Sequence, residues 1–131
     1  ADALRSLGYL SERAFEVPLR EAELRRELAD AEGERDALRR AAEVFPFQLD
    51  LQTRRAAVAE ELDDPVEWVR ARRAILGLAP VDRAEAHFQL ARALQAAGDR
   101  SEARTQVLRA LEIAPTFDEA LELLLVLRGE G

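Results

Sequence analysis

The chain has 131 residues, of which 48% are hydrophobic and 34% charged, and its formal net charge is −7. A chain of this size and composition folds as one globular domain, and its acidic balance disfavours nucleic acid and anionic membranes, which both attract basic surfaces. The absence of cysteine excludes disulfides, thiolate metal sites and a cysteine nucleophile.

After an N-terminal segment, residues 1–12, apolar side chains continue at near-heptad spacing straight through Gly33. One interpretation is a single helix over residues 18–44, which could pair with another chain. The other is a degenerate hairpin over residues 13–46 that turns at Gly33, since the residues leading into Pro46 match those leading into a later proline. This similarity between the two segments favours the hairpin.

Residues 47–80 predict a second hairpin. Apolar residues at helical spacing mark its first helix, and the second begins at Asp64, which is followed by proline and then by Glu67. An aspartate cap, a proline at the first helical position and a glutamate three residues after the cap together indicate a helix start. Trp68 is expected inside, because exposing a large apolar side chain costs roughly 1.5 to 3 kcal/mol.

Residues 82–115 carry the clearest hairpin. Asp82 and Asp99 are each followed by a glutamate three residues later, which is the capping-box pattern that opens a helix. Gly98 ends the first helix, and Pro115 cannot continue the second. Two helices joined by so tight a turn lie antiparallel.

Residues 116–129 predict a last helix that caps the array. Three of its apolar residues are expected to cover the preceding hairpin: Leu121, Leu124 and Leu125. Three others are expected to point away from it: Leu123, Val126 and Leu127. A terminal cap normally turns a polar face to water, so this surplus predicts self-association of the last helix and a homodimer.

A sequence motif that ends in proline recurs along the chain, at Pro46, Pro80 and Pro115, with spacings of 34 and 35 residues. Such a period is typical of stacked helical hairpins, each of which needs a neighbour to bury its apolar stripe. The predicted fold is therefore all-α, a short right-handed solenoid of antiparallel hairpins with a C-terminal capping helix. No apolar run approaches the roughly 18 residues that span a bilayer, so membrane insertion is not expected.

The stretch from Leu90 to Pro115 resembles the tetratricopeptide repeat (TPR). The matching positions are Leu90, Ala91, Leu94, Gly98, Ala103, Val107, Ala110 and Pro115. The resemblance implies that the first helix of each hairpin lines a groove for a protein or peptide partner. The groove residues that it implies are Asp50, Thr53, Arg54, Glu85, Phe88, Gln89, Arg92 and Gln95. The chaperone-tail clamp of this family relies on Asn and Lys, neither of which occurs here.

The segment from Leu4 to Leu10 is similar to the Leu-x-x-Leu-Gly-Tyr segment that often closes the catalytic domain of sulfatase-like hydrolases of the alkaline phosphatase superfamily. This resemblance implies an alternative, in which the chain is the C-terminal helical-repeat module of such an enzyme and the active site lies upstream. The other interpretation of the segment is an amphipathic turn that packs on the first hairpin.

The sequence contains no recognisable catalytic or metal-binding constellation. His87 is the only histidine, and its neighbours one helical turn away are apolar, so we expect it to pack between helices. Adjacent carboxylates on a helix point in different directions, so the acidic pairs are expected to be solvated. The predicted function is a non-catalytic scaffold for protein interaction or oligomerisation, without a cofactor or metal.

Overall fold

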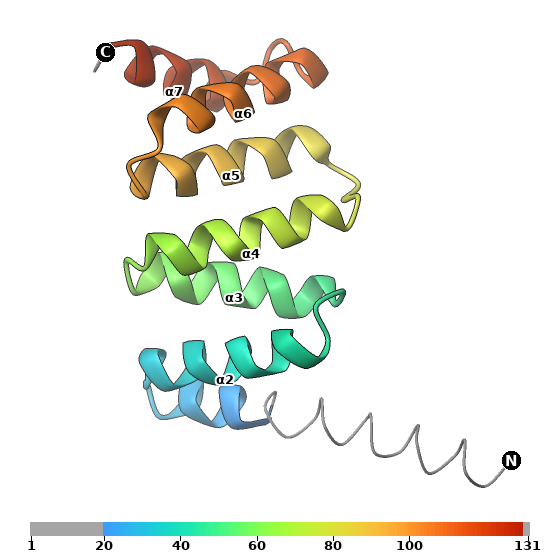
Figure 1. The fold of residues 1–131 in the computed structure, drawn as a ribbon, viewed down its shortest axis with the longest axis vertical. Helices are drawn as coiled ribbons and strands as arrows, with labels where there is room; N and C mark the ends of the chain where they lie inside the picture. Colours follow the sequence, from blue (N-terminus) through green and yellow to red (C-terminus); the bar gives the residue numbers. More distant parts are fainter. Residues whose placement is uncertain (1–19, 130–131) are drawn as a thin grey trace, which may run out of the picture.

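The computed structural model describes residues 20–129, so the segment from Leu4 to Leu10 lies outside the described residues. Residues 20–27 are helical, and they are followed by α2 (Ala31–Val44), α3 (Leu49–Glu61), α4 (Pro65–Gly77), α5 (Arg83–Ala96), α6 (Arg100–Ile113) and α7 (Asp118–Gly129). The described part contains no strand. Consecutive helices pack against each other and run in opposite directions, so the molecule is an all-α stack of helix pairs (Figure 1).

One aspartate builds each of the three turns within the pairs. Its backbone N–H donates to the carbonyl oxygen five residues earlier and closes the first helix: Asp30 to Arg25, Asp64 to Ala59 and Asp99 to Leu94, at 2.7, 2.9 and 2.9 Å. The residue before the aspartate has a left-handed backbone, with φ of 56°, 55° and 84° at Ala29, Asp63 and Gly98. These bonds form the Schellman motif that commonly ends a helix.

The same aspartates then cap the second helix of each pair. A carboxylate oxygen of Asp30, Asp64 or Asp99 accepts a hydrogen bond from the backbone N–H three residues later, at 2.9, 3.3 and 3.1 Å. One residue therefore satisfies a carbonyl at the end of one helix and an N–H at the start of the next. This explains why so short a turn reverses the chain reproducibly.

The turn predicted at Gly33 is misplaced. The chain reverses at residues 28–30, and Gly33 lies within the first turn of α2, where its N–H is the group that Asp30 caps. The single helix over residues 18–44 is wrong for the described residues, because the break at Ala29 separates two helices. The residue that caps α2, Asp30, stands three residues before the glycine.

Small side chains dominate the core. The alanines with no exposed surface are Ala22, Ala37, Ala41, Ala56, Ala59, Ala71, Ala91, Ala93, Ala103, Ala110 and Ala120. Between α5 and α6 they lie among larger residues such as Leu90, Leu94 and Val107. Alanine at the contacts allows neighbouring helices to approach closely while the leucines fill the space beside them.

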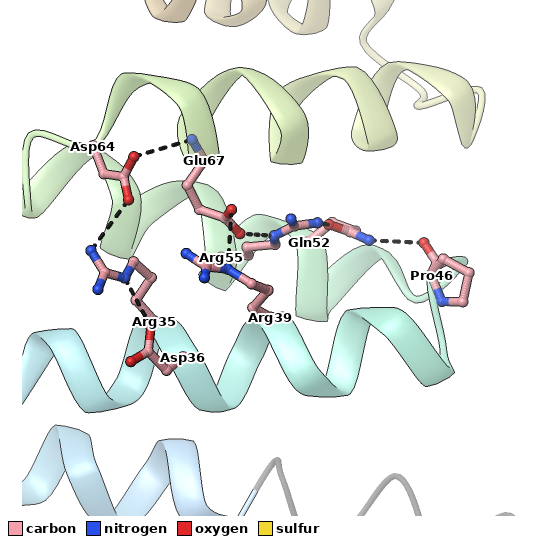
Figure 2. Close-up of polar contacts among 8 residues, drawn as sticks. All are labelled: Arg35, Asp36, Arg39, Pro46, Gln52, Arg55, Asp64 and Glu67. Carbon is pink, nitrogen blue, oxygen red and sulfur yellow. Dashed lines mark hydrogen bonds and ion pairs between the residues drawn. The ribbon is translucent and has the colours of Figure 1, made fainter.

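A buried carboxylate joins the first two helix pairs. Glu67 of α4 is 2% exposed, and it pairs with Arg55 of α3 and, at 3.5 Å, with Arg39 of α2. Arg55 also donates to Gln52, whose amide donates to the carbonyl of Pro46 in the loop before α3 (Figure 2). The network connects three helices and one loop, so it specifies how the pairs sit on each other.

The same contact recurs one repeat later in a more exposed form. Arg73 of α4 pairs with Glu102 of α6 at 2.6 Å, and their side chains are 46% and 32% exposed. The hydrogen bond from Arg73 holds the pKa of Glu102 below its ordinary value. Glu67 and Glu102 occupy the third position of their helices, so the glutamates of the predicted capping boxes link successive pairs through arginine.

We predict that Ala29→Gly stabilises the protein by about 0.5 to 1 kcal/mol. Glycine adopts the left-handed backbone of this position without the strain that alanine has there, and this gain exceeds the larger entropy that a glycine loses on folding. Urea unfolding measures the change. The matched control is Ala57→Gly in the exposed face of α3, which should destabilise by about 1 kcal/mol. Equal losses in the two variants would contradict the role assigned to the turn.

We predict that Glu67→Gln lowers the free energy of unfolding by roughly 2 to 3 kcal/mol, because it leaves buried arginine charge without its partner. The matched control is Glu102→Gln, which changes the equivalent but more exposed glutamate and should cost less than about 1 kcal/mol. Thermal and urea unfolding of both variants give the comparison. Similar costs would show that burial of Glu67 is not what makes its contact important.

Candidate functional site

The first helices of successive pairs share one side of the stack. These elements are residues 20–27, α3, α5 and α7, which all run in the same direction and which we call the first-helix face (Figure 1). Ion pairs tie neighbours on it together: Arg54 of α3 lies 3.8 Å from Glu23, and Arg92 of α5 lies 3.2 Å from Glu60 of α3. The face is therefore continuous and carries charges of both signs.

A hollow of about 370 Å³ lies near the N-terminal end of this face. It is lined by Arg26, Ala29, Asp30, Ala31, Glu34, Thr53, Arg54, Ala57, Val58 and Glu61. We call it the N-terminal hollow. Two arginines and three carboxylates around so small a space give it mixed charge.

Glu34 is the unusual residue of the N-terminal hollow. It is 4% exposed, and its Oε1 atom has no hydrogen-bond partner. Burial raises the pKa of its carboxyl above the ordinary value, and the guanidinium groups of Arg26 and Arg54 offset this only in part. A buried carboxylate without full hydrogen bonding destabilises the folded protein at neutral pH.

A second hollow, of about 580 Å³, lies between the N-terminal ends of α5 and α7. Its lining comprises Asp82, Ala84, Glu85, Phe88, Gln89, Ala114, Thr116, Phe117 and Glu119. The rings of Phe88 and Phe117 contact each other with centroids 5.0 Å apart. This C-terminal hollow combines an aromatic pair with three acidic residues and has no cation in its lining.

The centre of the face is held by Arg92. Its guanidinium lies over the ring of Trp68 at 5.3 Å, pairs with Glu60 and donates to Gln89 at 2.8 Å. Behind it, Arg72 of α4 is half-buried, and burial lowers the pKa of its guanidinium. The guanidinium of Arg92 is thus occupied by contacts within the chain, so the two hollows are the surfaces more available to a ligand.

Of the eight predicted groove residues, five line one of the two hollows, Arg92 lies at the centre of the face, and two lie elsewhere on α3 and α5. Thr53 and Arg54 line the N-terminal hollow, whereas Glu85, Phe88 and Gln89 line the C-terminal one. Asp50 is exposed in the first turn of α3, and Gln95 is half-buried near the end of α5. All eight lie on α3 or α5, the first helices of their pairs.

Several lining residues were not predicted, because they come from other elements: Arg26, Asp30, Glu34, Phe117 and Glu119. The groove was assigned from the first helices of the second and third hairpins only. Arg26 lies in the helix of residues 20–27, Asp30 in the turn after it and Glu34 in α2, whereas Phe117 immediately precedes α7 and Glu119 lies in it. The proline period could have indicated Phe117 as a candidate. A phenylalanine follows Pro115 by two residues at Phe117, and another follows Pro46 by one residue at Phe47.

The predicted orientation of the last helix differs from the observed one. Leu123 and Leu127 are 9% and 0% exposed and belong to the core shared with α6, so of the three residues expected to point away only Val126 is exposed. Leu121 and Leu125, which were expected inside, are 40% and 67% exposed. The inward stripe follows the spacing of Ala120, Leu123, Leu124 and Leu127, which is typical of one helix face.

The remaining titratable candidates have structural surroundings. His87 is buried in α5, and its Nδ1 donates to Oε1 of Gln106 in α6 at 2.7 Å. Trp68 is 7% exposed, as predicted. Within residues 20–129 no three His, Asp or Glu side chains are grouped to hold a metal ion, and none of the helices there is long and apolar enough to cross a membrane.

No family model matches the sequence, and a search of curated proteins finds no match. Comparison of the fold, by contrast, finds TPR structures. MamA superposes with a TM-score of 0.72 at 14% identity over 91% of this chain, which spans 64% of the MamA chain. The N-terminal domain of stress-induced protein-1 from C. elegans gives 0.68 at 18% identity, covering 90% of this chain and 97% of that domain.

A third structure is the first TPR of Spaghetti (RPAP3) bound to the HSP90 peptide SRMEEVD. It superposes with a TM-score of 0.65 at 18% identity, over 90% of this chain and 93% of that one. At identities this low the likeness concerns the fold. The chain has a TPR-like fold.

We predict that Glu34→Gln raises the urea midpoint at neutral pH, because it removes a buried charge. The folded protein holds the Glu34 proton more tightly than the unfolded chain, so wild-type stability falls as pH rises from the ordinary glutamate pKa through the raised one. Below the ordinary pKa the carboxyl is protonated in both states, and the advantage of the variant should disappear.

Urea unfolding across a pH series measures this difference. The control is Glu43→Gln, which changes an exposed carboxylate of the same helix and should leave the midpoint nearly unchanged. A lower midpoint for Glu34→Gln at neutral pH would mean that the carboxylate is stabilised in the fold.

Proposed function

We propose that the chain is a non-catalytic protein-interaction module that holds an extended segment of a partner protein on its first-helix face. The likeness to TPR domains supports this, since one of them was solved with a bound peptide. The two hollows on the face add to the support. They lie at opposite ends of the first helices, because one includes Ala29 and Asp30 of the turn after residues 20–27 and the other includes the starts of α5 and α7.

The C-terminal hollow supplies the chemistry of the proposed ligand. Phe88 and Phe117 offer an apolar surface, and Asp82, Glu85 and Glu119 surround it with negative charge. An apolar side chain can pack on the aromatic pair while a neighbouring cation meets the carboxylates. The observation that carries the proposal is that the lining of this hollow combines an aromatic pair with three carboxylates and contains no arginine or lysine. The bound segment is therefore one in which an apolar residue adjoins arginine or lysine.

An acidic tail is the less suitable ligand for this chain. The peptide SRMEEVD in the RPAP3 structure contains two glutamates and an aspartate. The present sequence has no lysine or asparagine, and its net charge is −7. Carboxylates of such a peptide would meet like charge at the C-terminal hollow, which costs binding free energy.

Selection from a display library of random peptides tests the proposal. The retained sequences should place leucine or phenylalanine next to arginine or lysine. Synthetic copies of them should bind in fluorescence anisotropy more tightly than SRMEEVD does. Retention of no peptide, or selection of acidic sequences, would overturn the proposal.

Variants of the C-terminal hollow locate the bound segment. Phe88→Ala should weaken binding tenfold or more, because an aromatic anchor in an interface contributes on the order of 2 kcal/mol. Glu119→Arg, which changes an exposed residue, should weaken a basic peptide several-fold without loss of folding. The control is Glu112→Arg on α6, which lies outside the first-helix face and should leave the affinity unchanged. Equal effects of the two charge reversals would place the ligand elsewhere.

A further inference from the structure

α7 is a first helix whose outer side has no second helix against it among the described residues. On α5, this outer side is covered by α6 and consists of His87, Ala91 and Leu94, which are 7%, 0% and 2% exposed. His87 bonds to Gln106 of α6, and the other two lie in the core that α5 and α6 share. The equivalent residues of α7, each 34 positions later, are Leu121, Leu125 and Arg128.

The inward sides of α5 and α7 confirm this register. Ala86, Leu90 and Ala93 of α5 are buried, and the residues 34 positions later, Ala120, Leu124 and Leu127, are buried too. In contrast, Leu121 and Leu125 are 40% and 67% exposed. The helix therefore presents to solvent the side on which the preceding pairs receive another helix.

Four residues form a self-complementary stripe on this outer side. Asp118, Leu121, Leu125 and Arg128 follow each other at intervals of three, four and three residues, which places them on one face of the helix. An acidic residue stands at one end, a basic residue at the other, and two leucines lie between them. Both end residues are exposed, and no ion pair involves Asp118 or Arg128 within residues 20–129.

The order of charges identifies the occupant. When two copies of the stripe are placed antiparallel about a twofold axis, Asp118 of each copy faces Arg128 of the other, and Leu121 faces Leu125. Every contact then occurs twice, as a closed isologous interface requires. A parallel arrangement would put like charges together at both ends. Antiparallel packing is also the arrangement of consecutive helices throughout residues 20–129 (Figure 1).

We propose that two copies of this chain associate through the α7 stripe, as an antiparallel helix pair held by four leucines and two ion pairs. The dimer is weak, because a stripe of this size buries less than the roughly 1,200 to 2,000 Å² of a stable interface. The stripe lies on the outer side of the last helix, so association leaves the C-terminal hollow open. Two first-helix faces in one particle would raise the avidity for a partner that carries two binding segments.

Sedimentation velocity of the full chain, from micromolar to millimolar concentration, tests the proposal. The wild type should shift from monomer towards dimer as its concentration rises. Leu125→Glu should abolish the shift, because it places a charge in the centre of the stripe. The matched control is Val81→Glu, which changes a fully exposed apolar residue between α4 and α5 and should leave the shift intact.

Charge exchange separates this interface from any other contact. Asp118→Arg and Arg128→Asp should each weaken self-association several-fold, because each puts like charges together twice. An equimolar mixture of the two variants, and the chain that carries both substitutions, should recover it. Circular dichroism of each variant checks that α7 remains helical.

A chain that stays monomeric up to millimolar concentration would overturn the proposal. So would a dimer that persists in Leu125→Glu, or charge reversals that fail to compensate each other in the mixture. These outcomes leave peptide binding at the C-terminal hollow unaffected, so the two proposals fail independently.

Discussion

The aspartate at each turn within a helix pair is the constraint on which the rest of the structure depends. Its N–H closes one helix and its carboxylate opens the next, at Asp30, Asp64 and Asp99 alike. Because the reversal takes only a few residues, the two helices must lie antiparallel and side by side. Every first helix consequently runs in the same direction, and the side chains on these helices form one surface with two chemically different ends.

Carboxylates and arginines join successive pairs alongside the apolar packing between them. The buried carboxylate of Glu67 binds two arginines, whereas its counterpart Glu102 makes one more exposed pair with Arg73. A buried ion pair contributes little net stability, but it disfavours every arrangement in which one of its charges is left alone. The junction between the first and second pairs therefore combines this charged network with a small apolar cluster, whereas leucine and alanine packing dominates the C-terminal half.

The proposed functions occupy separate parts of this scaffold. The aromatic pair of the C-terminal hollow belongs to the first-helix face, and the stripe from Asp118 to Arg128 belongs to the outer side of the last helix. Both arise at α7, which completes the hollow with Phe117 just before its start and then presents leucines to solvent. A weak dimer would strengthen binding to a divalent partner without altering either hollow, because avidity needs only that two sites be linked.

The sequence by itself determined the stacked helix pairs and the starts of α4, α5 and α6. Caps, prolines and the period near 34 residues are local signals, and they located α3 to α6 and the first helices that line the face. It misplaced the first turn because Ala29 adopts a left-handed backbone that sequence rules assign to glycine, and Gly33 stood close enough to attract the assignment.

Tertiary structure alone decided which side of each helix is covered and which charges are buried. The leucines of α7 are too numerous for their spacing to choose a face, so only contact with α6 shows that Leu123 and Leu127 lie inside. The two hollows likewise collect residues from turns and neighbouring helices that are distant in the sequence. Local propensity sets where helices begin and end, whereas burial depends on what packs against them.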